Sequence, residues 1–410
     1  MKRLILYEFK KLWNKPAILA VVALMLYSAM MTGIYYLYYE QTTITGEGEK
    51  VSGVGAYWAV KEEAKELEGT VDQQYLENLV KQFNSSIEKK DFEHRFGMDM
   101  MKYQYSNQLI NFAAFGGGVS NFTMGLDFDF LGSEKDFYNQ FKSSVKQLIR
   151  DNNEFNWFRY TDEQLKKIDE KVDAEKMPFE VSYASGLEKI TIDYAKQYWL
   201  VLIVLAFALS GIFSKDSSNG IDEISLSSTY GRKKNMNAKI MAGNLFAITV
   251  YVIFLAALFA LNGSFASLHG LGQSAQAFWY TCLYDINMGM GMLLMFGLGL
   301  LGILIAANFI MMISIRVKYA KLSAVLSVAS VWALVELTKT ANPLQLQLNP
   351  IYFATRLGVI NSGITDFDPY FFIGDVMIPY SLIAVGLTII YIAAIRLLTV
   401  SKYKRYALRG

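Results

Sequence analysis

The chain is poor in the residues that build disulfides, metal sites and nucleic-acid-binding surfaces. It contains one cysteine and two histidines among 410 residues. The single cysteine, Cys282, excludes a disulfide within the chain. His94 and His269 lie far apart with no cysteine beside them, so we expect no zinc site. The formal net charge is only +2, and no basic stripe is interleaved with aromatic residues, so we expect no nucleic-acid partner.

Sequence motifs for ATP binding and hydrolysis are also missing. The chain has no Gly-x-x-x-x-Gly-Lys-Ser/Thr phosphate loop, so we do not expect it to bind ATP as P-loop proteins do. It has neither a His-Glu-x-x-His motif nor a Gly-x-Ser-x-Gly motif, which disfavours a membrane hydrolase. We therefore expect no enzyme activity and no cofactor in this chain.

Long apolar runs are what the sequence does contain. Hydrophobic residues make up 53% of the chain, and a membrane-spanning helix needs about 20 of them to cross a hydrocarbon core about 30 Å thick. Six runs lie at Pro16–Tyr39, Tyr198–Phe213, Ile240–Leu261, Ile286–Ile315, Leu322–Leu337 and Ile378–Leu398. The second is short, but the apolar face of Ile190–Ala195 extends it. The sequence therefore predicts an all-α integral membrane protein with about six transmembrane helices, the first within residues 16–39 and the others within 196–399.

Lysine and arginine are concentrated in alternate connections between these runs. They precede the first run, lie between the second and third and between the fourth and fifth, and follow the sixth in the tail 400–410. Residues 262–281 contain neither type, and residues 339–377 contain only Lys339 and Arg356. Because basic connections stay on the inner side, we predict a multi-pass protein of the cell membrane with both termini in the cytoplasm. Abundant Asn, Lys and Tyr are compatible with a bacterial source.

A long polar segment, residues 40–195, separates the first two runs and is predicted to be an extracellular domain. Thr161 and Gln164 have the spacing of a helix-capping box, and Leu165, Ile168 and Val172 follow at helical spacing. Residues 71–90 also carry an apolar stripe of helical period. We expect a large, mainly helical extracellular insertion between helices 1 and 2, or alternatively two long helices that extend those spans outward.

Two cytoplasmic segments have patterns of interest. Residues 1–15 place apolar side chains opposite lysines, which predicts an amphipathic helix in the inner headgroup layer; the alternative is a charged flank that only sets topology. Residues 214–239 mix acidic residues, a few apolar ones and a basic cluster. A short helix over 219–228 would offer a docking surface for a partner, whereas the alternative is a solvated loop.

These features resemble the permease subunits of ABC-2 type ABC exporters. Those chains begin with an interfacial elbow helix carrying a Glu-x-Lys-Lys-like cluster, and they have an acidic residue, a Leu-to-Arg stretch and a lysine around the second connection. The matching positions here are Glu8 and Lys11, then Glu223, Leu226, Arg232 and Lys239, with Asn349-Pro350 before the last run. Thr229-Tyr230 stands where the family has a proline. The resemblance covers the membrane half of the chain and not residues 40–195.

The resemblance implies the membrane-spanning permease subunit of an ATP-driven exporter. Such a subunit lies in membrane lipid as a homodimer, or as a heterodimer with a second permease, and the bound ATP and Mg belong to a partner ABC ATPase subunit. It also implies that Glu8, Lys11, Glu223, Leu226 and Arg232 contact that ATPase. A peptide, a drug-like amphiphile and other substrates all remain open.

Two alternatives from other classes stay open. One is a sensor or immunity membrane protein whose extracellular domain binds an antimicrobial peptide or a cell-wall precursor. The other is a secondary carrier, which the scarcity of ionisable residues expected at membrane depth disfavours.

Glycines are frequent in the fourth run. Gly291, Gly297 and Gly302 predict close packing between helices, because small residues let backbones approach one another. The alternative is a kink in this helix.

Overall fold

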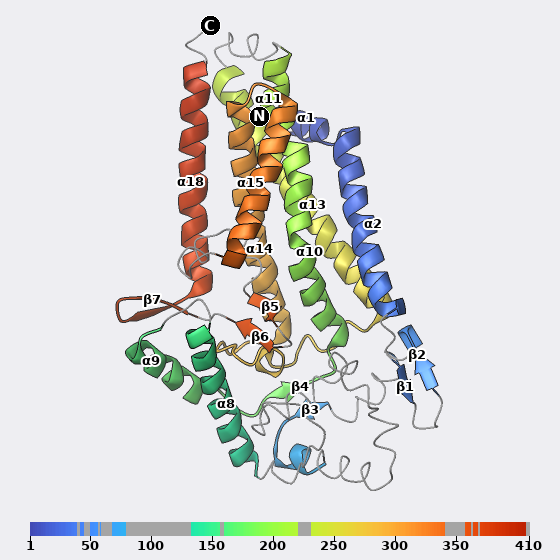
Figure 1. The fold of residues 1–410 in the computed structure, drawn as a ribbon, viewed down its shortest axis with the longest axis vertical. Coiled ribbons are helices and arrows are strands. Elements are labelled where there is room, and N and C mark those ends of the chain that lie inside the picture. The colour runs from blue at the N-terminus through green and yellow to red at the C-terminus, as the bar shows by residue number, and fades with distance from the viewer. Residues whose placement is uncertain are drawn as a thin grey trace.

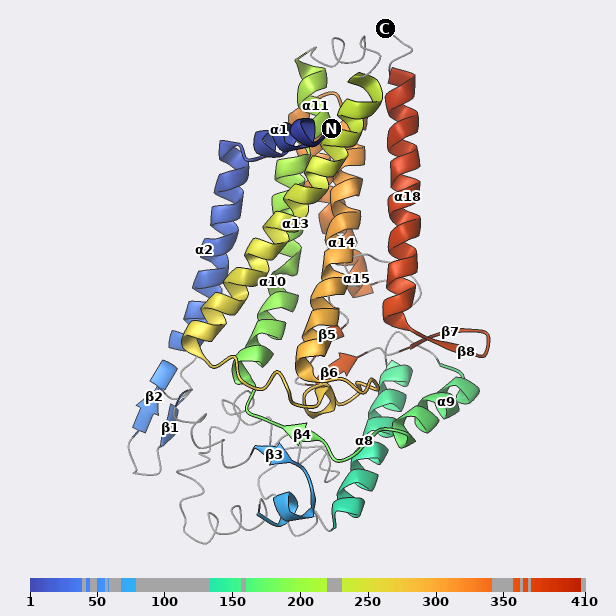
Figure 2. The same ribbon diagram turned by 180° about the vertical axis from the view of Figure 1, so that it is seen from behind.

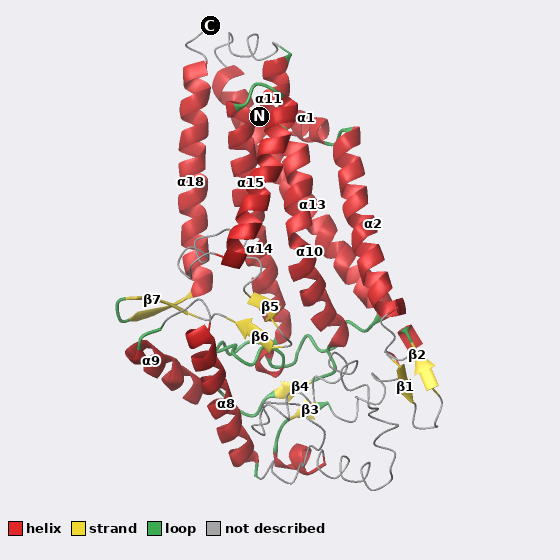
Figure 3. Cartoon of the chain, viewed as in Figure 1, coloured by secondary structure: helices red, strands yellow, loops and turns green. Residues whose placement is uncertain are grey.

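The computed structural model describes residues 1–38, 42–44, 50–55, 58, 68–78, 133–155, 160–219, 231–340, 357–361, 364–367 and 370–406. Long helices lie side by side in a bundle, and shorter helices and β-hairpins gather at one of its ends (Figure 1). The N-terminus and the end of the last helix lie at the opposite end, which we call the α1 end. The described strands all lie at the end away from α1 (Figure 3).

The bundle contains eight helices of the described chain. They are α1 (Lys2–Leu12), α2 (Lys15–Tyr38), α10 (Ser185–Leu209), α11 (Gly211–Ser218), α13 (Gly231–Phe265), α14 (Met288–Arg316), α15 (Ala320–Thr340) and α18 (Tyr380–Tyr406). α1 lies across the bundle, whereas the others run along it (Figure 2). α10 begins at Ser185, so the second span extends outward as its apolar face predicts.

Five helical segments of the described chain are long and apolar enough to cross a membrane. They are Lys15–Ile34, Gly186–Ser218, Lys234–Phe265, Met288–Arg316 and Ser381–Lys402. Large apolar side chains on α2 and α18 face outward, among them Leu19, Leu26, Ile389 and Leu397. A helix satisfies its own backbone hydrogen bonds, which lipid cannot do, and outward apolar side chains suit a lipid surface. The structure therefore confirms the prediction of a mostly helical, multi-pass membrane protein.

A second, smaller core lies beyond the bundle. It contains β3 (Gly69–Thr70), α8 (Glu134–Phe155), α9 (Asp162–Asp173) and β4 (Glu180–Val181), and we call residues 68–78, 133–155 and 160–183 the insertion domain. Phe137, Phe141, Val145, Ile168, Val172 and Val181 are buried in its core. The same core includes Leu283 of the α13–α14 connection and Tyr370 of β7, so the insertion domain packs against the bundle's own connections.

The remaining short elements form hairpins and one 3-10 turn. β1 (Thr42–Ile44) pairs with β2 (Lys50–Ser52), β5 (Leu357–Asn361) with β6 (Ile364–Phe367), and β7 (Tyr370–Ile373) with β8 (Val376–Pro379), all antiparallel. The turn η3 (Ala275–Ala277) lies in the α13–α14 connection. The β7–β8 hairpin leads directly into α18.

The predicted capping box of α9 is confirmed. The Thr161 hydroxyl accepts a hydrogen bond from the Gln164 N–H at 3.3 Å, and the Gln164 side chain accepts one from the Thr161 N–H at 3.1 Å. Leu165, Ile168 and Val172 are buried on one face, as their spacing predicts. Of the predicted apolar stripe over 71–90, residues 73–78 are helical and the rest lie outside the described residues.

Thr161→Ala is expected to weaken the first turn of α9 by about 1 kcal/mol, because the cap then loses its acceptor. Amide hydrogen exchange in α9 of the full-length protein should become about fivefold faster. Thr161→Ser keeps the hydroxyl and serves as the matched control. Equal exchange rates in all three proteins would contradict the role of this cap.

Candidate functional site

A hydroxyl group from α14 interrupts the helix that forms the second span. The Ser314 Oγ accepts hydrogen bonds from the N–H groups of Phe213 and Ser214 at 3.1 and 3.2 Å, and donates one to the Ser210 carbonyl at 2.6 Å. The Ser214 hydroxyl donates to the same carbonyl at 2.7 Å. A side chain inserted into the i→i−4 ladder separates two helical segments, so Ser210 marks the boundary between α10 and α11.

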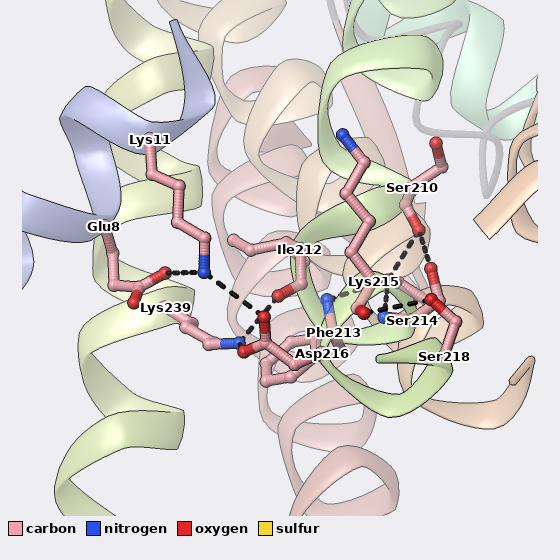
Figure 4. A network of polar contacts seen from close by, with 11 residues as sticks. Glu8, Lys11, Ser210, Ile212, Phe213, Ser214, Lys215, Asp216, Ser218 and Lys239 are labelled. Atoms are coloured by element: carbon pink, nitrogen blue, oxygen red, sulfur yellow. Dashed lines mark hydrogen bonds and ion pairs between the residues drawn. The ribbon is translucent and has the colours of Figure 1, made fainter. Parts of the chain in front are cut away.

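An ionic network lies six residues beyond this boundary, at Asp216. Asp216 of α11 pairs with Lys239 of α13 and, at 3.2 Å, with Lys11 of α1. The Lys239 ammonium also donates to the Ile212 carbonyl at 2.9 Å, and Lys11 lies 3.9 Å from Glu8. Figure 4 shows these side chains converging from three helices. One carboxylate therefore connects α1, α11 and α13.

The members of this network differ in burial. The Lys239 side chain is 3% exposed, Asp216 is 13% exposed and Glu8 is 8% exposed, whereas Lys11 is 47% exposed. A buried ammonium without a partner is costly, so Lys239 depends on Asp216. Burial lowers the pKa of Lys11, but the carboxylates of Asp216 and Glu8 outweigh this and raise it above its ordinary value. Lys11 therefore stays charged at neutral pH.

Apolar contacts fix α1 beside this network. Leu12 is buried, and Ile5, Phe9 and Trp13 pack against the core of the bundle. The Trp13 ring lies 4.9 Å from the Phe246 ring of α13, measured between centroids. The amphipathic helix predicted for residues 1–15 therefore forms, and its apolar face packs on α13 while Lys11 reaches α11.

The structure places the predicted ATPase-contact residues in different settings. Glu8 and Lys11 belong to the same network, but Glu8 is buried within it and only Lys11 has a substantially exposed side chain. Glu223 and Leu226 lie outside the described residues. Arg232 is the second residue of α13, and its side chain also lies outside them. α11 ends at Ser218 and α13 begins at Gly231, both at the α1 end.

The predicted packing glycines of α14 also differ in their surroundings. A Cβ at Gly291 would overlap the Trp279 ring, so this glycine lies at a close approach, and Gly302 is buried. A Cβ at Gly297 would meet no described atom within 4 Å, which corrects the expectation for that position. Gly299 is the tightest site, because a Cβ there would overlap the Tyr194 hydroxyl.

Tyrosines fill the space that Gly299 leaves. The hydroxyls of Tyr194 and Tyr251 lie 3.0 Å apart, Tyr198 donates to the Gly299 carbonyl at 2.8 Å, and Tyr251 donates to the Phe296 carbonyl at 2.8 Å. All three rings are buried. A buried hydroxyl needs a hydrogen-bond partner, and here α14 supplies carbonyls to tyrosines of α10 and α13.

A second ionic cluster lies near the other end of the same helices. Lys189 pairs with Asp193 on α10, Thr32 of α2 donates to Asp193 at 3.0 Å, and Asn262 of α13 donates to it at 3.5 Å. Both charges lie near the start of the apolar helical segment Gly186–Ser218. They are partnered by one another and by neighbouring helices, as buried charges in a membrane protein require.

The two ionic clusters have matching separations along two helices. Asp193 and Asp216 are 23 residues apart, and so are Lys239 and Asn262. At 1.5 Å per residue this corresponds to about 34 Å, close to the thickness of a hydrocarbon core of about 30 Å. The clusters therefore have the spacing of the two boundaries of a membrane.

Sequence reasoning missed Asp216, Ser314 and the Lys189–Asp193 pair. Only the i,i+4 spacing of Lys189 and Asp193 is a signal within the sequence. Asp216 follows an apolar run, as charged residues that flank a membrane span commonly do, so its position alone did not indicate an ion pair. Comparison with protein-family models, with curated proteins and with solved structures finds no match to this chain.

Proposed function

We propose that this chain is the membrane-spanning permease subunit of an ATP-driven exporter of the ABC-2 type. The observation that carries the proposal is the Lys11–Asp216–Lys239 network, which joins the crosswise helix α1 to the two helices that flank residues 220–230. Because the sequence resembles ABC-2 permeases, we expect an elbow helix and a connection of this kind at the contact with the ATPase. ATP and Mg²⁺ are bound by the partner ATPase in this proposal.

We take α15 as a sixth membrane crossing. Its 21 residues span about 31 Å, and it packs against α10, α11 and α14. With six crossings the basic connections all fall at the α1 end, which the positive-inside rule assigns to the cytoplasm. The insertion domain is then extracellular, and both termini are cytoplasmic.

The proposed mechanism is mechanical coupling. A push by the ATPase on residues 220–230 or on Lys11 moves α1, α11 and the start of α13 together, because Asp216 holds all three. The Ser210 boundary lets α11 tilt relative to α10, since its backbone groups are bonded to the Ser314 hydroxyl and not only to the helix ladder. Two permease subunits, identical or different, enclose the substrate path.

The double variant Glu223→Ala/Arg232→Ala is expected to lose co-purification with an ATPase subunit encoded beside this chain. Both residues belong to the proposed docking segment, whereas the spans that fold the bundle are unchanged. Lys318→Ala is the matched control, because Lys318 is an exposed lysine in the α14–α15 connection at the same end. Retained co-purification of the double variant would overturn the proposed contact.

A sensor or immunity protein is the second candidate. The insertion domain favours it, because this domain has a hydrophobic core separate from that of the bundle. Binding of a cell-wall precursor or an antimicrobial peptide by the full-length chain without any ATPase would support it. Deleting the insertion domain is a poor test, since Leu283 and Tyr370 would lose the core in which they are buried.

A further inference from the structure

Glu175 lies where the insertion domain meets the connections of the bundle. It follows the end of α9, and both of its carboxylate oxygens are buried without a hydrogen-bond partner among the described residues. Other contacts join the segments that surround Glu175. The Tyr160 hydroxyl donates to the Tyr370 carbonyl at 2.9 Å, and the rings of Tyr284 and Tyr370 lie 5.6 Å apart. The neighbouring Lys176 pairs with Asp285 of the α13–α14 connection.

The groups that face Glu175 come from four elements. Lys142 of α8 and Lys171 of α9 are the charged ones, and Cys282 of the α13–α14 connection and Tyr370 of β7 are the neutral ones. Neither lysine lies within ion-pair distance of the Glu175 carboxylate, so no salt bridge within the described part of the chain compensates the burial of Glu175. An unpartnered buried carboxylate is disfavoured relative to the neutral carboxyl.

The protonation state of Glu175 therefore changes with pH near neutrality. Burial raises the pKa of Glu175 to about 8, against the attraction of Lys142 and Lys171. Burial also raises the pKa of Cys282 and that of Tyr370 to about 12. These two groups stay neutral throughout the range in which Glu175 loses its proton.

We propose that Glu175 is a protonation switch that fastens the insertion domain to the α13–α14 connection and the β7–β8 hairpin. The neutral carboxyl fits the buried site and keeps this junction closed. The carboxylate needs water, so deprotonation opens the junction and loosens the insertion domain from the bundle. This proposal does not rest on the proposed transport function, because it concerns only contacts within the chain.

The direction of the pH dependence follows from the raised pKa. In the open state Glu175 is solvated and titrates near its ordinary value of 4.5, whereas in the closed state it titrates near 8. The closed junction is therefore most favoured below pH 4.5 and is progressively lost as pH rises to about 8. One unit of pKa difference corresponds to a tenfold change in an equilibrium, so the opening constant rises by up to about tenfold per pH unit in this window.

Cys282 is a built-in probe of this opening, because it is the chain's one cysteine, is fully buried on the bundle side of the junction and interacts with both Glu175 and Tyr370. The labelling rate of Cys282 by a thiol reagent is measured on the full-length protein in lipid nanodiscs from pH 5 to 9. Each rate is divided by the rate for the denatured chain at the same pH, which removes the ionisation of the free thiol. The quotient reports the opening constant.

The quotient is expected to rise steeply between pH 5 and 8 in the wild type and to level off above pH 8. In Glu175→Gln it should stay low and flat, because the amide cannot ionise. Glu170→Gln changes an exposed glutamate of α9 and should keep the wild-type slope. His269 of the α13–α14 connection, which contacts Glu68 of the insertion domain, is unchanged in both variants and cannot explain a difference between them.

A flat quotient in the wild type overturns the proposal, and that profile decides the matter even if Glu175→Gln does not fold. An equal slope in Glu175→Gln overturns it as well. The proposal is supported if the wild type and Glu170→Gln show the slope and Glu175→Gln does not.

Discussion

Asp216→Ala is expected to destabilise the α1 end of the bundle by about 3–5 kcal/mol, because it leaves the buried Lys239 ammonium without its partner. The Lys239 side chain is only 3% exposed, so bulk water does not solvate its ammonium. Its other acceptor among the described residues, the Ile212 carbonyl, carries no full charge. Denaturant titration of the protein in detergent micelles, followed by far-UV circular dichroism, measures the loss.

Two further variants separate charge burial from other causes. Asp216→Ala/Lys239→Met replaces the pair by an apolar side chain of similar length, so most of the lost stability should return. Lys11→Ala removes the half-exposed partner and should cost only about 0–1 kcal/mol. Equal losses in Asp216→Ala and Lys11→Ala would contradict the assignment of Lys239 as the dependent charge.

Gly299→Ala is expected to disrupt the centre of the bundle. The added Cβ would overlap the Tyr194 hydroxyl and come within 2.6 Å of the Tyr251 hydroxyl. Both rings are fully enclosed, so neither can move aside without displacing α10 or α13. Overpacking of this kind costs about 1–3 kcal/mol, and the broken tyrosine hydrogen bonds cost about 1 kcal/mol each in addition. Thermal unfolding in nanodiscs measures the effect.

Gly297→Ala is the matched control two residues away on the same helix. A Cβ there meets no described atom within 4 Å, and alanine is the better helix former, so its stability should be unchanged or slightly higher. Tyr194→Phe combined with Gly299→Ala removes the hydroxyl that the Cβ would overlap and should recover part of the loss. If the two single glycine variants unfold at the same temperature, the tyrosine packing described for α14 is wrong.

The two ionic clusters connect neighbouring helices of the bundle near both ends of α10 and α13. Asp193 joins three helices near one membrane boundary, and Asp216 joins α1, α11 and α13 near the other. Most residues between the clusters are apolar, and the polar ones include Lys196, Gln197 and Asn244 besides tyrosines whose hydroxyls are bonded to α14. In the proposed function, these connected helices pass a displacement from α1 toward the insertion domain.

Local patterns in the sequence determined much of the architecture. The apolar runs predicted the long helices because every residue of a span must suit lipid, which leaves a continuous signal. Residues 1–15 predicted α1 through the opposition of Ile5, Phe9 and Leu12 to the lysines. The Thr161–Gln164 box predicted the start of α9, since both partners of the cap lie within one turn. In each case the interaction is encoded within a few neighbouring residues.

Only the tertiary structure decided which polar residues meet. Lys11 and Asp216 are 205 positions apart, and Ser314 enters the α10–α11 boundary from a helix about 100 positions away. No periodicity links such residues, because their approach depends on how whole helices cross. Gly297 and Gly299 look alike in the sequence, yet one faces open space and the other supports tyrosines, since two positions along a helix point in different directions. The same holds for Glu175, which is buried among groups from four elements that the chain brings together only on folding.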